Sequence, residues 1–232
     1  METVEARIAK ARAALGEVQL RVGTSRDRWE APTLPLATGL DAVLPQGLRR
    51  GQVISVEGST SLMLALAAAA SAAGSWTAVV GIPSLGVVAA ARRGLDLARV
   101  GLIPHPGVQA AAAAGACIDG MDVVLLGEGL ALSDSDRRRL ASRARERGVV
   151  MIAGGAWTGA HVSLTVVESR WSGLGAGDGR LRTRDLTVRA QGRQAGRARL
   201  VTLALDGVGV PARHGAGVPT GPAPLRALGG AA

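Results

Sequence analysis

The chain has 232 residues, of which 47% are hydrophobic and 2% aromatic, and its 27 basic and 18 acidic residues give a formal charge of +9. This length and apolar content predict one globular domain with a sizeable core and exclude an unfolded chain. The positive charge suits nucleic acid or an acidic protein surface, and an ordinary solvated, arginine-rich surface remains the alternative. The single cysteine, Cys117, excludes an internal disulfide and a cysteine-based zinc site, and its alanine-rich surroundings predict a buried thiol.

The first segment of the chain, residues 1–23, is predicted to be an amphipathic N-terminal helix. Its apolar residues recur at helical spacing with Arg and Glu between them, at Val4, Ile8, Ala11, Leu15, Val18 and Val22. Such a stripe needs a covering surface, so Val4, Ile8, Ala11 and Leu15 are interaction candidates for self-association or for a partner. Packing back onto the chain's own domain is the alternative. Residues 24–35 are polar with two prolines and predict a linker.

Residues 36–206 alternate strand and helix signals. Continuous apolar runs at 52–56, 76–82, 99–103, 122–126 and 149–153 alternate with helical segments at 61–73, 84–93 and 107–117, and with a helix for which Ser133 is the N-cap and Asp134 and Asp136 lie in the first turn. This order predicts an α/β fold with a mainly parallel central sheet. Three later runs, Val162 to Arg170, Asp185 to Gln191 and Ala198 to Asp206, alternate with period two, which predicts antiparallel strands that extend one edge of the sheet.

The composition of the two ends of the chain predicts where the chain is disordered and where the protein is localised. Residues 207–232 hold eleven Gly or Pro without periodicity, which predicts a disordered tail that is either inert or a partner-binding peptide. The N-terminus has no apolar leader, and the alanine-rich run at 65–73 is too short to span a bilayer. We therefore expect a cytoplasmic protein without a membrane partner.

A degenerate phosphate loop follows the apolar run 52–56. Gly58, Ser59, Thr60 and Ser61 stand where a P-loop ATPase carries G-x-x-x-x-G-K-[ST]. With Gly58 as the first glycine, the Gly, Lys and Ser/Thr positions are Met63, Leu64 and Ala65; with Gly58 as the second glycine, the Lys and Ser/Thr positions are Ser59 and Thr60. Neither alignment supplies the lysine that neutralises phosphate charge. We therefore expect a pseudo-ATPase without catalytic residues, cofactor or metal, although the helix N-terminus could still hold an anion.

The residues that precede this loop resemble the entrance to the RecA-family core. The stretch from Leu36 to Val53 is similar to the family's "TG-x-x-x-LD-x-x-L-x-GG-x-x-x-G" pattern, and the resemblance covers about residues 36–206. The family places a catalytic glutamate after the strand that follows the phosphate loop, and Pro83, Ser84 and Leu85 stand there instead. The Walker B strand ends at Gly127 and Glu128, about one residue late for a magnesium ligand, and an exposed loop glutamate is the simpler interpretation of Glu128.

Within this superfamily, the short core, degenerate loop, arginine-rich last strand pair and Gly/Pro tail are most similar to ImuA-type proteins, of which the actinobacterial form is called ImuA-prime. The resemblance implies an accessory role in SOS-induced mutagenic translesion DNA synthesis. The implied partners are ImuB, a Y-family polymerase homologue, and, indirectly, an error-prone DnaE-type polymerase. Cell-division inhibitors of the SOS response share a similarly reduced core, so the family relation alone does not fix the function.

Two arginine clusters offer another function. One lies on the helix after Ser133, where its members spread over more than one face. The second follows the last strand pair, and its DNA-binding candidates are Arg180, Arg182, Arg184, Arg189, Arg197 and Arg199. On a strand, the first three point the same way and could follow the backbone of single-stranded DNA without reading its sequence. The alternatives to an accessory role are thus an ATP-dependent recombination ATPase and a sequence-independent DNA-binding module.

Overall fold

The structure, a computed structural model, describes residues 33–174, 179–193 and 197–205, and within 173–182 it describes backbone only. The predicted N-terminal helix, most of the linker and the tail 207–232 lie outside the described residues. The linker is shorter than expected at its end: Thr33 and Leu34 form strand β1 (Thr33–Leu34), which pairs with β2 (Leu48–Arg49). The apolar side chain of Leu34 is buried and belongs to the core cluster, although a proline follows it.

The rest of the described chain is built on one sheet of eight strands in the order β10-β9-β8-β3-β7-β6-β4-β5. The strands are β3 (Val53–Glu57), β4 (Thr77–Val80), β5 (Val100–Ile103), β6 (Val123–Leu126), β7 (Val150–Gly154), β8 (Val162–Leu174), β9 (Gly179–Gln191) and β10 (Arg199–Ala204). Strands β3 to β8 pair in parallel, whereas β9 and β10 pair antiparallel. The predicted α/β class, with a mainly parallel sheet and antiparallel C-terminal strands, is confirmed.

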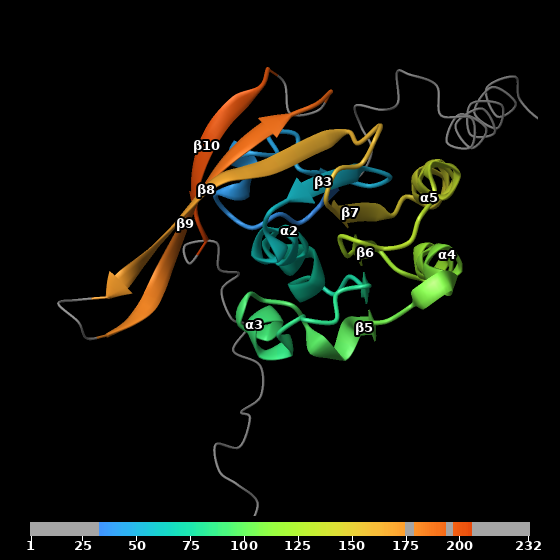
Figure 1. Ribbon diagram of the computed structural model, residues 1–232, viewed down its shortest axis with the longest axis horizontal. Helices are drawn as coiled ribbons and strands as arrows, with labels where there is room; N and C mark the ends of the chain where they lie inside the picture. The colour runs from blue at the N-terminus through green and yellow to red at the C-terminus, as the bar shows by residue number, and fades with distance from the viewer. Residues whose placement is uncertain (1–32, 175–178, 194–196, 206–232) are drawn as a thin grey trace, which may run out of the picture.

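Helices cover both faces of the parallel part of the sheet (Figure 1). They are α2 (Thr60–Ala72), α3 (Val87–Arg92), α4 (Ala110–Gly120) and α5 (Asp134–Arg147). One core cluster joins α2 and the 34–48 segment to residues such as Ile54 and Ile152, and the other joins α4 and α5 to Val53 and Met151. Neighbouring residues of one central strand pack into opposite core clusters, so nearly every residue of the strand is apolar.

A local capping signal explains where helix α5 begins. Ser133 is the N-cap of α5: its Oγ accepts from the Asp136 amide at 3.2 Å, and the Asp136 carboxylate accepts in turn from the Ser133 amide at 3.1 Å. This reciprocal capping box was predicted in part by the Ser and the two acids.

Cys117 is buried on α4, as expected, and burial raises the pKa of its thiol. In the described part of the chain, no helix combines the length and apolar character that crossing a bilayer requires.

The β8–β9 hairpin extends well beyond the helical layers as a two-stranded arm (Figure 1). Both strands have 13 residues, whereas β3 has only five, so more than half of the hairpin has no parallel partner beside it. A register shift between Val166 and Glu168 marks an irregularity in β8 where it leaves the core. The outer part of this arm, from Val167 on β8 to Arg184 on β9, contributes none of its described side chains to either core cluster.

Candidate functional site

A pocket of about 280 Å³ opens at the carboxyl ends of four parallel strands. This edge of an open α/β sheet is where ligands bind in such folds. The pocket is lined by the β3–α2 connection, the loop after β4 and the ends of β6 and β7; the residues are Val56, Gly58, Ser59, Thr60, Met63, Gly81, Ile82, Pro83, Ser84, Gly127, Glu128 and Gly154. The structure thus brings the degenerate loop and Glu128, 70 positions apart in the sequence, to one site.

The connection from β3 to α2 consists of only two residues, Gly58 and Ser59. Gly58 adopts a positive φ of 84°, which favours glycine, and the Ser59 Oγ accepts a hydrogen bond from the Leu62 amide at 3.2 Å. Helix α2 begins at Thr60, which is exposed. A phosphate loop needs a longer glycine-rich segment between strand and helix to surround a phosphate group. The Ser59 hydroxyl is already engaged as an N-cap.

The helix start decides between the two alignments of the loop. Met63, Leu64 and Ala65, which the first alignment places at the Gly, Lys and Ser/Thr positions, lie inside α2 and are buried. Met63 lines the pocket, but Leu64 and Ala65, at the Lys and Ser/Thr positions of this alignment, pack in the core and do not line it. Only the second alignment, with Ser59 and Thr60 at the Lys and Ser/Thr positions, keeps both residues beside the pocket.

The charge of the pocket is the reverse of what a phosphate site requires. Among its twelve lining residues none is basic, and Glu128 is the one acidic residue. Glu128 is exposed and lies in the loop after β6, separated from the strand by Gly127, as predicted for a loop glutamate. A basic group does lie at the first turn of α2: Arg184 of β9 places its NH1 3.4 Å from the Ser61 Oγ. Ser61 itself is not among the lining residues, so this guanidinium lies beside the pocket.

Glycines form much of the pocket wall, and sequence reasoning missed them. A Cβ on Gly127 would lie 2.6 Å from the carbonyl carbon of Gly81, and one on Gly154 would lie 2.8 Å from the Glu128 amide nitrogen. The ends of β4, β6 and β7 therefore approach each other so closely that side chains are excluded. A signal was present in the sequence, because each of these strands is followed by or ends in glycine.

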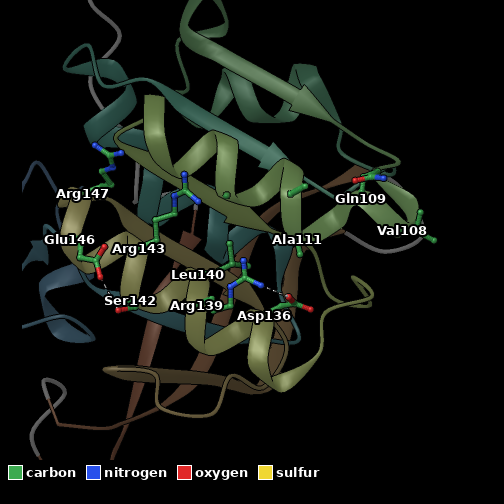
Figure 2. Close-up of a pocket in the computed structure, with 12 residues that line it drawn as sticks. Val108, Gln109, Ala111, Asp136, Arg139, Leu140, Ser142, Arg143, Glu146 and Arg147 are labelled. Atoms are coloured by element: carbon green, nitrogen blue, oxygen red, sulfur yellow. Dashed lines mark hydrogen bonds and ion pairs between the residues drawn. The ribbon is translucent and has the colours of Figure 1, made fainter.

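A larger hollow, about 1010 Å³, lies between α4 and α5 (Figure 2). Small residues of α4, such as Ala111 and Gly115, form one side, and Arg139, Arg143 and Arg147 of α5 form the other. These arginines are paired with acids: Arg139 lies 3.9 Å from Asp136, while Arg143 and Arg147 both bind Asp119. The Arg143 hydrogen bond lowers the pKa of the Asp119 carboxyl. The charges of the hollow are thus largely balanced within the fold.

The structure separates the predicted DNA-binding arginines. Arg184 and Arg189 lie on opposite faces of β9, since they are an odd number of residues apart in one strand. Arg189 and Arg197 are exposed, whereas Arg199 donates from NH2 to the Ala42 carbonyl at 2.7 Å and so ties β10 to the core. Arg180 and Arg182 lie in β9, but their side chains are not described. The predicted stripe of Arg180, Arg182 and Arg184 stays a prediction, and strand alternation places Arg189 on the other face from it.

The arginines of α5 and the histidine His161 make contacts within the fold. The arginines of α5 spread over several faces: Arg137 lies over the Trp157 ring at 4.9 Å, while Arg143 turns toward α4. His161 accepts from the Val53 amide through Nδ1 at 3.0 Å, which is a structural role. Within the described ranges, no group of three or more His, Cys, Asp or Glu is arranged to hold a metal ion.

These features define an α/β protein whose carboxyl-edge pocket has the location of a nucleotide site without the loop that such a site uses. The family model described as the MT3502 N-terminal domain matches residues 42–159, half of the chain, and the chain belongs to this family. It is also 38% identical over 122 residues to the uncharacterized protein Rv3395c of Mycobacterium tuberculosis (strain ATCC 25618 / H37Rv). That match covers 52% of this chain and 60% of the relative, so the chain spans under two thirds of the curated relative's length. The family match includes the pocket and ends before the β8–β9 arm.

Proposed function

We propose that this chain is a RecA-like accessory protein that supports SOS-induced mutagenic translesion synthesis without hydrolysing ATP. Its partners in this proposal are an ImuB-like Y-family polymerase homologue and, through it, an error-prone DnaE-type polymerase. The resemblance of residues 36–206 to ImuA-type proteins supports the pathway. The same proposal places the protein in the cytoplasm, with its contacts made by the N-terminal segment and the tail.

The observation that carries the non-catalytic part is the two-residue connection between β3 and α2. Phosphoryl transfer depends on a backbone cradle, a lysine and a magnesium ligand that together neutralise the β- and γ-phosphates. The turn of Gly58 and Ser59 provides too little backbone for the cradle, and Glu128 places a negative charge in the same pocket. Because like charges repel at short range, this carboxylate disfavours a triphosphate.

A complementation experiment tests the proposal in its cellular setting. In a host that lacks its own copy of the gene, the full chain should restore damage-induced mutation, and Thr60→Ala and Glu128→Ala should restore it equally well. Both residues line the pocket, so loss of complementation by both variants, with unchanged protein levels, would contradict a non-catalytic role. In parallel, the full chain should copurify with the ImuB-like protein. Failure of the wild-type chain to do so would remove the partner from the proposal.

The competing ATPase function is tested on the purified full chain. We expect no binding of Mg-ATP at millimolar concentration and no hydrolysis, with or without single-stranded DNA. DNA-stimulated hydrolysis that Thr60→Ala abolishes would establish the ATPase instead.

Two sets of variants test the contact surfaces. Ile8→Asp and Leu15→Asp should abolish the association of the N-terminal segment with a second copy of the chain or with the ImuB-like protein. The control Ala13→Asp, which lies outside the apolar stripe, should leave that association intact. Deletion of residues 207–232 should weaken copurification with the ImuB-like protein. Unchanged binding in either case would exclude that segment as the contact.

A further inference from the structure

Trp171 lies on the β8–β9 arm with 48% of its surface exposed. It belongs to neither core cluster, whereas Trp157 is only 6% exposed and packs against the α4–α5 side of the sheet. The chain contains four tryptophans and no Phe or Tyr, so Trp171 is a rare aromatic side chain placed away from the core. A half-exposed indole offers a large, rigid apolar surface together with a polar edge, which is the kind of side chain that interfaces use.

The guanidinium of Arg184 lies over one face of the Trp171 ring. Arg184 stands directly opposite Trp171 in the β8–β9 register, and its guanidinium carbon lies 5.1 Å from the ring centroid. Its Nε donates to the Ser169 Oγ at 2.9 Å, and its NH1 lies 3.4 Å from the Ser61 Oγ of α2. The cation is thereby fixed over the indole, and the accessible remainder of Trp171 faces solvent.

The segment that carries this pair is rich in arginine. Its outer part, residues 167–185, contains four arginines, Arg170, Arg180, Arg182 and Arg184, and three acids, Glu168, Asp178 and Asp185, whereas Arg189, Arg193, Arg197 and Arg199 lie toward the other end of the hairpin. Glu168 is already paired with Arg170 at 2.8 Å. An aromatic ring beside arginines is the combination that single-stranded nucleic acid binding uses: bases stack on the ring and cations neutralise phosphates.

A second tryptophan–arginine pair in the same molecule provides an internal comparison. Trp76 is 46% exposed, and the guanidinium of Arg99 lies 5.9 Å from its ring. There, however, Arg99 is 3.7 Å from the Asp96 carboxylate, and the Trp76 amide donates to Asp122 at 3.0 Å. Carboxylates thus lie beside the arginine at Trp76. A guanidinium over a tryptophan ring is therefore not by itself a nucleic-acid site. At Trp171, in contrast, the cation over the ring donates to the hydroxyls of Ser169 and Ser61, and the pair lies on the projecting arm.

We propose that Trp171 and Arg184 form a stacking platform for single-stranded nucleic acid on the β8–β9 arm. One base lies on the open part of the indole, and the adjacent phosphates contact Arg184 and other arginines of the arm. Binding is indifferent to base sequence, because every base has a face that can stack. This site goes beyond the accessory role proposed above and does not depend on it.

Fluorescence anisotropy with the full chain tests the site, using fluorescein-labelled dT20 and rU20 at 50 and 200 mM salt. Trp171→Leu should weaken dT20 binding about tenfold or more, since stacking on an aromatic ring contributes this much per base. Trp171→Phe should retain most of the affinity. The matched control, Trp76→Leu, should bind within about twofold of wild type, because both tryptophans are half exposed and both pair with arginine.

Salt dependence separates stacking from charge. Arg184→Gln should make the slope of log K against log salt shallower by about 0.7, the value for one phosphate contact on a single strand, while Trp171→Leu should leave the slope unchanged. Equal binding of dT20 and rU20 assigns the platform to either nucleic acid, and preference for dT20 assigns it to DNA. Thermal melting confirms that each variant is folded.

The proposal is overturned if dT20 does not bind at 50 mM salt, if Trp171→Leu and Arg184→Gln both bind as wild type does, or if Trp76→Leu loses as much affinity as Trp171→Leu. Binding restricted to double-stranded DNA would overturn it as well. None of these results changes the copurification or complementation outcomes, so failure of the platform is distinguishable from failure of the accessory role.

Discussion

Substitution of Gly127 by alanine tests how tightly the carboxyl-edge pocket is built. An added Cβ would lie 2.6 Å from the carbonyl carbon of Gly81 and 3.1 Å from the Ile82 Cγ1, so the end of β4 must move away from β6. The Gly127 amide also donates to the Val80 carbonyl at 2.8 Å, which resists that movement. Overpacking of this kind costs about 1–3 kcal/mol of folding free energy, and a clash with backbone places Gly127→Ala at the upper end.

Gly120→Ala is the matched control. Gly120 is the last residue of α4, a Cβ there would meet nothing within 4 Å, and its backbone does not have a positive φ. The same chemical change should therefore be neutral or stabilise by up to about 1 kcal/mol, because alanine loses less backbone entropy than glycine.

Urea unfolding followed by circular dichroism measures both variants. We expect Gly127→Ala to lower the free energy of unfolding by about 3 kcal/mol, which corresponds to roughly 6–12 °C in Tm for a chain of this size. If Gly127→Ala is as stable as wild type while Gly120→Ala behaves as expected, the strands do not approach each other as described. The same destabilisation in both variants would mean that the cost comes from losing glycine and not from the contact with Gly81.

Three further changes test local features of the fold. Ser133→Ala should lower the free energy of unfolding by about 1 kcal/mol in urea titrations, since it removes the N-cap that bonds to Asp136, and an unchanged midpoint would exclude the cap as a stabilising element. Asp119→Asn should destabilise the protein at pH 7 but much less at pH 3: the Arg143 contact lowers the pKa of Asp119, so its stabilisation is complete above the unfolded pKa of about 4 and is lost as pH falls through the folded pKa. A pH-independent difference in unfolding free energy would contradict this linkage. Ala114→Leu, at a fully buried site on α4, should lower Tm by several degrees through overpacking, whereas Ala112→Leu on the exposed side of the same helix should not, and equal melting temperatures would contradict the assigned face.

Sequence patterns predicted the parallel sheet because its signals are local and strong. The continuous apolar runs of β3, β6 and β7 indicated strands covered on both faces, and the two core clusters confirm that their residues alternate between opposite helical layers. The start of α5 at Ser133 was predicted for the same reason, since the cap and the acids lie within one turn. Thr33 and Leu34 were assigned to a linker because two prolines flank a short segment, and their pairing with β2 depends on Arg49 and Leu48, which lie 16 and 14 positions away.

The site was predicted less completely, because its decisive features depend on distant segments. The absence of a lysine from the degenerate loop was visible in the sequence, but the two-residue length of the turn follows only from where β3 ends and α2 begins. Arg184 reaches Ser61 across 123 positions, a contact that no motif encodes. The six candidate arginines were listed by their position in the sequence, and the period-two alternation that places Arg184 on one face of β9 places Arg189 on the other.

The position of Arg184 links the two functional surfaces of the molecule. Its guanidinium contacts the Trp171 ring on the arm and the Ser61 hydroxyl in the first turn of α2, while Thr60 of the same turn lines the pocket. A strand that occupied the arm would therefore pass close to the helix N-terminus that a P-loop protein uses for its nucleotide. The short turn of Gly58 and Ser59 leaves this end of α2 accessible to a cation from a neighbouring strand. If the core binds no nucleotide, as we propose, the same helix terminus is available to support a surface for a polymer of phosphates.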